Sequence, residues 1–325
     1  MTESSTTEST NASQNSSMFF FARWLWVCAF AIPAGFVSIS RMGFRLTSTL
    51  PTYGVLTRIT DFGSNPTNIG MYAYIPEGIT TNPGLIVALH YCTGSANAFF
   101  DLSRYDTLAD RKKSFMVLYG DAPAVGKCWD VASPASLTHD GGGDSLGIAS
   151  AVRFAISNWN VNPDKIFVTG MSSGSMMTNV LAGSYPDLFK AGAAFSGVPF
   201  GCFYSNNGSS WSTPCALGQL IKTPQEWGDQ VRSAYPGYTG PRPRMQLWHG
   251  TDDDILDYQN FKEEIKEWTN VFGISENPAL TTQDDPEEFY TRTVYGNGEV
   301  EAYSLAGGPH NLILQEERVL QFFGL

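Results

Sequence analysis

The chain has 325 residues, enough for one large α/β domain or two smaller ones with a substantial core. Only 16% of the residues are charged, 13% are aromatic and 32 are glycine, a composition that indicates a compact, loop-rich fold and excludes a disordered chain. The formal net charge of -11, with no Lys/Arg cluster that could locally overcome it, argues against nucleic acid as a partner because such a surface repels phosphate.

The N-terminal part of the chain differs in composition from the rest. Residues 1–17 are nearly all Thr, Ser, Asn, Gln and Glu, and residues 19–39 are apolar apart from Arg23 and Ser38. An export signal fits the hydrophobic stretch 24–37, so we predict a secreted, extracellular protein. The alternative is a signal anchor, since the polar start lacks the usual positive charge and the apolar run approaches the roughly 20 residues that span a bilayer.

Cysteine usage agrees with export. Cys28 lies in the apolar N-terminal stretch and would leave with a cleaved signal. The other cysteines are Cys92, Cys128, Cys202 and Cys215. An even number in an exported chain predicts two disulfides, with three pairings possible by counting alone. Asn207 begins an Asn-Gly-Ser sequon and is a candidate glycosylation site.

Segment 1–48 precedes a region, 49–325, in which strand-length apolar runs alternate with helical patterns. This rhythm predicts one α/β domain, a mostly parallel sheet with helices on both faces. The expected strands are Met71–Ile75, Leu85–Leu89, Phe115–Tyr119, Ile166–Thr169, Ala191–Phe195, Met245–Trp248 and Val300–Leu305. The expected helices are Ser145–Ser157, Ser173–Gly183, Gln259–Val271 and Asn311–Phe322. The segment Gly201–Arg244, rich in Gly, Pro, Ser, Trp and Tyr, is interpreted as an insertion above the sheet.

The sequence Gly170-Met171-Ser172-Ser173-Gly174 lies between an expected strand and an expected helix. A serine on such a sharp turn is exposed, and glycines two residues away on either side let neighbouring backbone approach closely. The pattern by itself arises by chance in some chains, and a plain structural turn is the alternative. Its placement nevertheless favours Ser172 as the nucleophile of an α/β-hydrolase fold.

A serine nucleophile needs a general base, and histidine, with an ordinary pKa of about 6.5, suits that task. The chain order nucleophile, acid, histidine excludes His90 and His139, which precede Ser172. His249 directly follows a strand and is expected to shape the next turn. His310, in the loop between the last strand and the last helix, remains as the base.

The acid that orients the base is expected after His249. The local sequence does not distinguish among four candidates there, Asp252, Asp253, Asp254 and Asp257.

The glycine run 141–143 lacks the spacing of a phosphate-binding loop, so we interpret it as a helix entry with Asp144 as the cap. The four histidines are scattered along the chain, and the cysteines are better used in disulfides. We therefore expect no metal and no cofactor.

Together these motifs resemble fungal acetylxylan esterases of carbohydrate esterase family 1, which is related to feruloyl esterases and polyhydroxybutyrate depolymerases. The matching stretches are Asn65–Tyr74, His90–Gly94, Cys128–Asp130, Gly141–Gly147, Thr169–Asn179, Ser196–Tyr204, His249–Leu256 and Gly308–Asn311. The resemblance implies an enzyme that hydrolyses acetyl esters of acetylated xylan or xylo-oligosaccharides through an acetyl-enzyme intermediate.

The resemblance also assigns residues that local patterns left open. The family's His-Gly-x-x-Asp pattern falls on His249, Gly250 and Asp253, which selects Asp253 as the acid. The implied disulfides are Cys92–Cys128 and Cys202–Cys215. The chain departs from the family in having Ser175 after the elbow glycine, where alanine is frequent, and in the additional acids Asp252 and Asp254.

We expect an oxyanion hole formed by two backbone N–H groups. One belongs to Cys92, in the turn after the strand ending at Leu89, and the other to Ser173, which follows the nucleophile. Trp211 and Trp129 are candidate walls for a sugar ring, with core packing as the alternative for each. Two other functions compete with acetylxylan hydrolysis. They are a feruloyl or polyester esterase, and a carbohydrate-binding protein that retains the fold without turnover.

Overall fold

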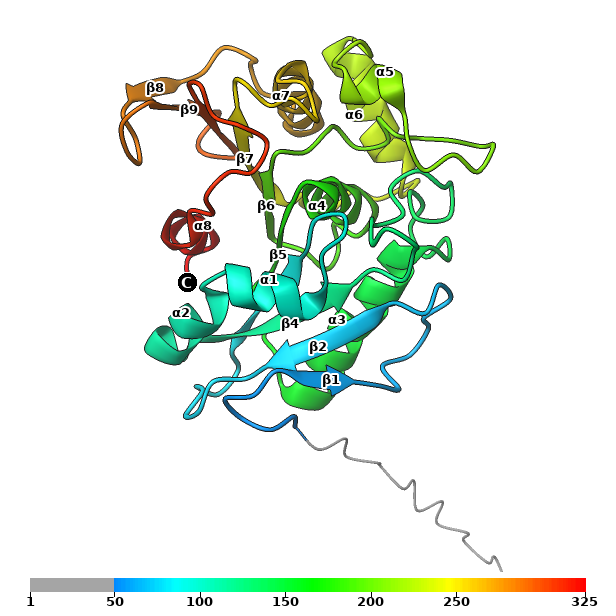
Figure 1. Ribbon diagram of the computed structural model, residues 1–325, viewed down its shortest axis with the longest axis vertical. Coiled ribbons are helices and arrows are strands. Elements are labelled where there is room, and N and C mark those ends of the chain that lie inside the picture. Colours follow the sequence, from blue (N-terminus) through cyan, green and yellow to red (C-terminus); the bar gives the residue numbers. More distant parts are fainter. Residues whose placement is uncertain (1–49) are drawn as a thin grey trace, which may run out of the picture. The chain divides into compact units, whose positions relative to one another are not determined.

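The computed structural model describes residues 50–325, so the expected signal peptide or anchor and Cys28 lie outside the described residues. The described chain builds a ten-stranded sheet in the order β1-β2-β4-β3-β5-β6-β7-β10-β9-β8 (Figure 1). The strands are β1 (Thr57–Ile59), β2 (Gly70–Tyr74), β3 (Gly84–Leu89), β4 (Phe115–Asp121), β5 (Ile166–Met171), β6 (Ala191–Phe195), β7 (Arg244–Gly250), β8 (Leu280–Gln283), β9 (Tyr290–Tyr295) and β10 (Val300–Leu305). The six central strands, β4-β3-β5-β6-β7-β10, pair in parallel. The outer strands, β1 and β2 on one side and β9 and β8 on the other, pair antiparallel.

The parallel centre of the sheet is buried on both faces. All six residues of β3 are buried, as expected for a strand that helices cover on both sides. Leu85, Val87 and Leu89 pack into one hydrophobic cluster, whereas Ile86 and Ala88 pack into another. Because successive side chains of a strand point to opposite faces, these two clusters are the two sides of one sheet.

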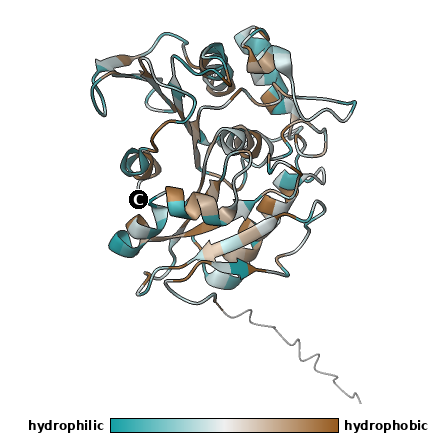
Figure 2. Ribbon diagram, in the orientation of Figure 1, coloured by the Kyte–Doolittle hydropathy of each residue, from teal (hydrophilic) through white to brown (hydrophobic). Residues whose placement is uncertain are grey.

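Helices divide between the two faces of the sheet. On the described chain they are α1 (Ala96–Leu102), α2 (Tyr105–Lys112), α3 (Asp144–Trp159), α4 (Ser173–Ser184), α5 (Thr213–Ala216), α6 (Pro224–Ser233), α7 (Gln259–Phe272) and α8 (Glu316–Phe323). Residues of α3, α4, α6 and α7 pack in the first cluster, and residues of α1, α2 and α8 in the second. The helices carry both hydrophobic and hydrophilic residues, as is typical of helices with one covered side (Figure 2). The predicted α/β-hydrolase architecture is confirmed.

The expected elements agree with the structure except at the C-terminus. Each of the seven predicted strands is present with ends that differ by up to two residues. The predicted helix Asn311–Phe322 is wrong at its start, because α8 begins only at Glu316. Leu312 and Leu314 are buried while Ile313 is 79% exposed, which is the alternation of an extended segment rather than a helix. The local patterns did not predict β1, β8, β9, α1, α2, α5 or α6.

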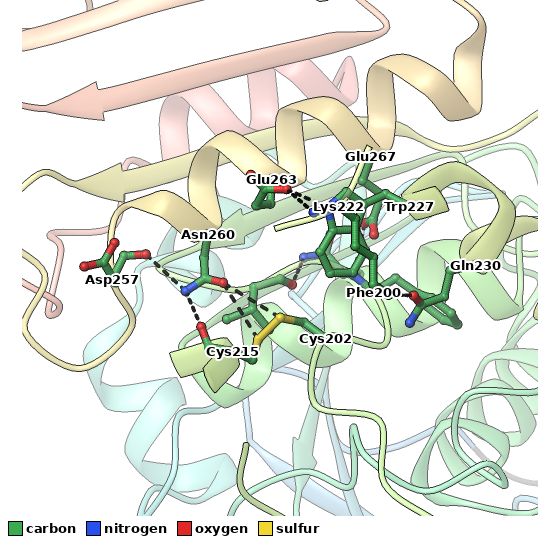
Figure 3. Close-up of a disulfide and its surroundings, with 12 residues drawn as sticks. Phe200, Cys202, Cys215, Lys222, Trp227, Gln230, Asp257, Asn260, Glu263 and Glu267 are labelled. Atoms are coloured by element: carbon green, nitrogen blue, oxygen red, sulfur yellow. Dashed lines mark hydrogen bonds between the residues drawn. A yellow bond between two sulfur atoms is a disulfide. The ribbon is translucent and has the colours of Figure 1, made fainter. Parts of the chain in front are cut away.

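The insertion Gly201–Arg244 contains its own helices and is attached to α7. The helix α6 begins with a capping box, in which Thr223 and Glu226 exchange side-chain and backbone hydrogen bonds. Figure 3 shows how the insertion is held. Near the disulfide of Cys215, Asn260 Nδ2 donates to the Cys215 carbonyl at 2.9 Å, and Trp227 Nε1 donates to Glu263 at 2.8 Å. None of the helices within residues 50–325 is long and apolar enough to cross a membrane.

Candidate active site

Ser172 lies on a sharp turn between β5 and α4. Its φ is 54°, in the left-handed region that side chains rarely adopt. A Cβ atom on Gly174 would come within 2.1 Å of the Leu89 carbonyl oxygen, and one on Gly170 within 2.4 Å of the Gly174 carbonyl oxygen. Only glycine permits such close backbone approach, so the two elbow glycines present Ser172 at the end of the sheet.

His310 lies between Ser172 and Asp253. Its Nε2 is 2.9 Å from Ser172 Oγ, and its Nδ1 is 2.8 Å from Asp253 Oδ2. The loops that carry His310 and Asp253 meet because β7 and β10 are parallel neighbours, whose carboxyl ends lie at the same edge. Gly250 makes this approach possible, since a Cβ atom there would be 2.1 Å from the Gly308 carbonyl oxygen.

The structure separates the four candidate acids. Asp253 is 8% exposed, whereas Asp252 and Asp254 are exposed and Asp257 accepts the backbone N–H of Gln259 in a local turn. Asp253 Oδ1 accepts the N–H groups of the residues two and three positions later, at 2.9 and 2.8 Å. Burial acts to raise the pKa of Asp253. Hydrogen bonds from His249 and His310 outweigh this and hold the pKa well below its ordinary range, so the carboxylate is ionised.

The side chain of His249 contacts the turn that it was expected to shape. Its imidazole is fully buried, with Nε2 2.8 Å from the Leu256 carbonyl oxygen and 3.0 Å from Asp253 Oδ2. The sequence analysis did not predict the contact between His249 and the acid. The spacing of four residues from His249 to Asp253 in the His-Gly-x-x-Asp pattern was the available clue.

The two expected oxyanion donors line one cavity with Ser172. Ser173 is the first residue of α4, so its N–H lies ahead of the intrahelical hydrogen bonds and points out of the helix end. Cys92, in the turn after β3, is joined to Cys128 by a disulfide. Both disulfides implied by the resemblance are present in the structure.

His90 holds the turn that carries Cys92. Its Nε2 accepts the Ala122 N–H at 3.0 Å, so its Nδ1 carries the proton and donates to the Tyr91 carbonyl at 2.6 Å. Burial lowers the pKa of His90, which favours this neutral form. The histidine excluded as a base thus has a structural role beside the expected oxyanion hole.

Ser172 and His310 open onto a cavity of about 470 Å³, which both candidate tryptophans line. Trp211 is 50% exposed and packs edge-on against Phe203, so its ring is available to a ligand. Trp129 is only 3% exposed and its Nε1 donates to the His90 carbonyl at 3.0 Å. Most of the Trp129 ring therefore packs in the core, the alternative that the sequence left open.

Two further expectations concern residues outside this cavity. The expected cap at Asp144 is wrong, because Gly143 occupies the N-cap and the Asp144 carboxylate instead accepts the Asp130 N–H at 2.9 Å. Asn207 is exposed in the insertion, where a glycan would be accessible. Within residues 50–325, no three His, Cys, Asp or Glu side chains come together in a geometry that could hold a metal.

Comparisons with known proteins place the chain in a family. Residues 70–211 match the family described as Esterase PHB depolymerase. An acetylxylan esterase of Coprinopsis cinerea is 51% identical over 276 residues, which cover 84% of this chain and 74% of that protein. Acetylxylan esterase A of Emericella nidulans is 44% identical over 277 residues, covering 84% of this chain and 90% of that protein.

A solved structure agrees with these relatives. The acetyl xylan esterase from Aspergillus awamori superposes with a TM-score of 0.81 at 43% identity, covering 83% of this chain and 99% of that chain. The chain therefore belongs to the acetylxylan esterase family of α/β hydrolases.

Proposed function

We propose that this protein is a serine esterase that removes acetyl groups from acetylated xylan and xylo-oligosaccharides. The observation that carries the proposal is the continuous hydrogen-bonded series of Ser172, His310 and Asp253 at the mouth of a cavity. The relatives named above are acetylxylan esterases, which supports acetyl as the acyl group and xylan as its carrier. A neutral polysaccharide is also compatible with a chain whose net charge is -11.

In the first half-reaction, Ser172 Oγ attacks the acetyl carbonyl carbon while His310 Nε2 takes the hydroxyl proton. The oxyanion that forms accepts hydrogen bonds from the N–H groups of Cys92 and Ser173. When this intermediate collapses, the bond from carbon to the sugar oxygen breaks. His310 returns the proton to that oxygen and releases the deacetylated sugar, leaving acetyl-Ser172.

In the second half-reaction, water attacks the acetyl-Ser172 carbonyl and His310 takes the proton of the water. The bond to Ser172 Oγ then breaks, the proton goes back to Oγ, and acetate leaves. Asp253 keeps the imidazole in the tautomer whose Nε2 faces Ser172, and its negative charge stabilises the imidazolium that forms in each half-reaction.

Trp211 is the proposed wall for the sugar. It is half exposed and lines the cavity, which suits an aromatic ring on which a sugar stacks. Trp129 contributes an edge of the same cavity, and its buried position suits a fixed wall better than a mobile contact.

We further propose that the protein is secreted and is glycosylated at Asn207. Two disulfides in the described residues support an oxidising compartment, and the exposed sequon supports modification. Expression in a fungal host, followed by mass analysis of the culture medium before and after enzymatic removal of N-glycans, tests both. Protein found only in the cells, or no mass change, would contradict them.

Measuring substrate preference tests the main proposal. We expect kcat/KM for acetate release from acetylated xylo-oligosaccharides to exceed that for release of ferulate from methyl ferulate or of monomer from a 3-hydroxybutyrate oligomer. The last substrate is included because residues 70–211 match a family named for a polyester depolymerase. Preference for either alternative would replace the acyl group proposed here. Absence of p-nitrophenyl acetate hydrolysis would instead indicate a binding protein.

A further inference from the structure

The carboxylate of Asp253 faces two imidazoles rather than one. Asp253 Oδ2 is 2.8 Å from His310 Nδ1 and 3.0 Å from His249 Nε2. Its other oxygen, Oδ1, accepts the N–H groups of Ile255 and Leu256. Three N–H groups therefore donate hydrogen bonds to the carboxylate, and His249 Nε2 lies 3.0 Å from the oxygen that His310 contacts.

The partners of His249 determine which of its ring nitrogens carries the proton. Nε2 lies 2.8 Å from the Leu256 carbonyl oxygen, which can only accept. Asp253 is ionised and can also only accept. Nε2 must therefore carry a hydrogen, which is directed to the Leu256 carbonyl and lies beside Asp253 Oδ2, so His249 and His310 both present an N–H group to the same oxygen.

The surroundings of His249 hold its ring in this orientation. His249 is the last residue but one of β7, where it pairs with Ser304 of β10, and its side chain is fully buried. The rings of Tyr258 and Phe261 pack against the imidazole with centroids 6.0 Å away. The ionisable groups that face it are Asp253, from the turn, and Glu264, from α7.

We propose that His249 is a positioning residue, whose Nε2–H holds Asp253 Oδ2 in line with His310 and shares the charge of the carboxylate. This proposal rests on the triad proposed above. Without this donor, Asp253 would keep its two backbone hydrogen bonds but lose the contact that directs Oδ2. Its charge would then act on His310 alone and attract the imidazole proton more strongly.

Two amide substitutions form a matched test. The amide nitrogen of glutamine reaches about as far as histidine Nε2, whereas asparagine is one methylene shorter and cannot reach Asp253. A hydrogen bond to a charged group is typically worth one to two orders of magnitude in an equilibrium or rate. His249→Asn should therefore lower kcat by about 10- to 100-fold with little change in KM, and His249→Gln should stay within about threefold of the native enzyme.

The pH profile separates positioning from general loss of structure. In His249→Asn, the acid limb of kcat/KM for p-nitrophenyl acetate should move to higher pH, because His310 then holds its proton more tightly. In His249→Gln, the acid limb of the kcat/KM profile should lie at the same pH as in the native enzyme. His139→Gln is the control, since His139 stacks on Tyr235 at 3.6 Å and contacts none of the groups discussed here.

Near-ultraviolet circular dichroism checks folding in each variant. If His249→Asn folds and retains native kcat and an unshifted limb, or if His249→Gln is impaired as severely as His249→Asn, the proposal is wrong. If His249→Asn does not fold, the proposal depends on His249→Gln, in which a loss of more than about tenfold in kcat would overturn it. Failure of the triad itself is distinguishable, because Asp253→Asn would then remain active whatever stands at position 249.

Discussion

The Ser173 hydroxyl accepts a hydrogen bond from the Trp129 backbone N–H at 2.8 Å, although Ser173 directly follows the proposed nucleophile. Both residues are buried, so this bond fixes the cavity wall to the start of α4. The neighbouring Ser172 instead directs its hydroxyl to His310. Two adjacent serines thus have different tasks, and substitution separates them.

Ser172→Ala should lower kcat by about 10⁴-fold or more, because no other group replaces the attacking oxygen. Ser173→Ala should lower kcat by no more than about tenfold, since it removes one neutral hydrogen bond and leaves the Ser173 N–H in place. Initial rates on p-nitrophenyl acetate measure both effects, with circular dichroism as the folding control. Full activity in Ser172→Ala would refute its assignment as nucleophile.

Asp253→Asn should cost on the order of 10⁴-fold in kcat, because the amide favours the wrong tautomer of His310. The same change at Asp252 or Asp254 should stay within about tenfold, since both side chains are exposed and make no contact with His310. The three variants are assayed on one acetyl ester. A crippled Asp252→Asn or Asp254→Asn beside an active Asp253→Asn would mean that the proposed acid is wrong.

Trp211→Ala should raise KM for acetylated xylo-oligosaccharides by about 3- to 10-fold, as expected for the loss of one aromatic contact. Tyr204→Ala is the matched control. Tyr204 is 54% exposed in the same insertion but does not line the cavity with Ser172, so its KM should stay within about twofold. Equal effects of the two substitutions would remove Trp211 from the sugar site.

Each disulfide should stabilise the fold by roughly 2–4 kcal/mol, chiefly by restricting the unfolded chain. The loops they close span 36 and 13 residues. Paired alanine variants of each bridge, unfolded in urea, measure the free energies. Peptide mapping under non-reducing conditions should recover Cys92 linked to Cys128 and Cys202 linked to Cys215, and free thiols or crossed pairs would contradict the structure.

Burial raises the pKa of Glu264 to about 7, partly offset by its interaction with His249 and a hydrogen bond from Asn179. Between about pH 4.5 and 7, the folded protein holds a proton that the unfolded chain has released. The stabilisation from that proton is complete below about pH 4.5 and is lost as the pH rises through 7. Glu264→Gln should therefore be more stable than the native protein at pH 8, by about 3 kcal/mol at most, and similar to it at pH 4.5.

Urea unfolding at pH 4.5 and pH 8 measures this difference. Glu276→Gln, at an exposed acid in the loop after α7, is the control and should change stability little at either pH. A Glu264→Gln variant whose stability follows the native protein at both pH values would show that Glu264 is not protonated near neutrality.

The sequence predicted most of the fold because its central strands are short, fully apolar runs. Strands such as β3 and β6 are buried on both faces, so their hydrophobicity is unbroken and easy to recognise. The edge strand β8 is mostly exposed and its neighbour β9 is mostly half-buried, and these two polar strands were missed. The extended segment 311–315 before α8 was mistaken for helix. Its three consecutive apolar residues are compatible with both the helical and the strand periodicity.

The sequence by itself singled out Ser172, because a nucleophile elbow is encoded in five consecutive residues with glycines at both ends. It also singled out His310, because the base follows the nucleophile and the acid in the chain and lies after the last strand. Local sequence patterns left four candidate acids, and only the family resemblance chose among them before the tertiary structure brought Asp253 to His310. Only the tertiary structure decided that His249 contacts the same Asp253 oxygen and that Trp129 is largely core. Asp253 and His310 are 57 positions apart in the chain. Side-chain direction at the end of a parallel sheet depends on how neighbouring loops pack, and that packing leaves no local pattern in the sequence.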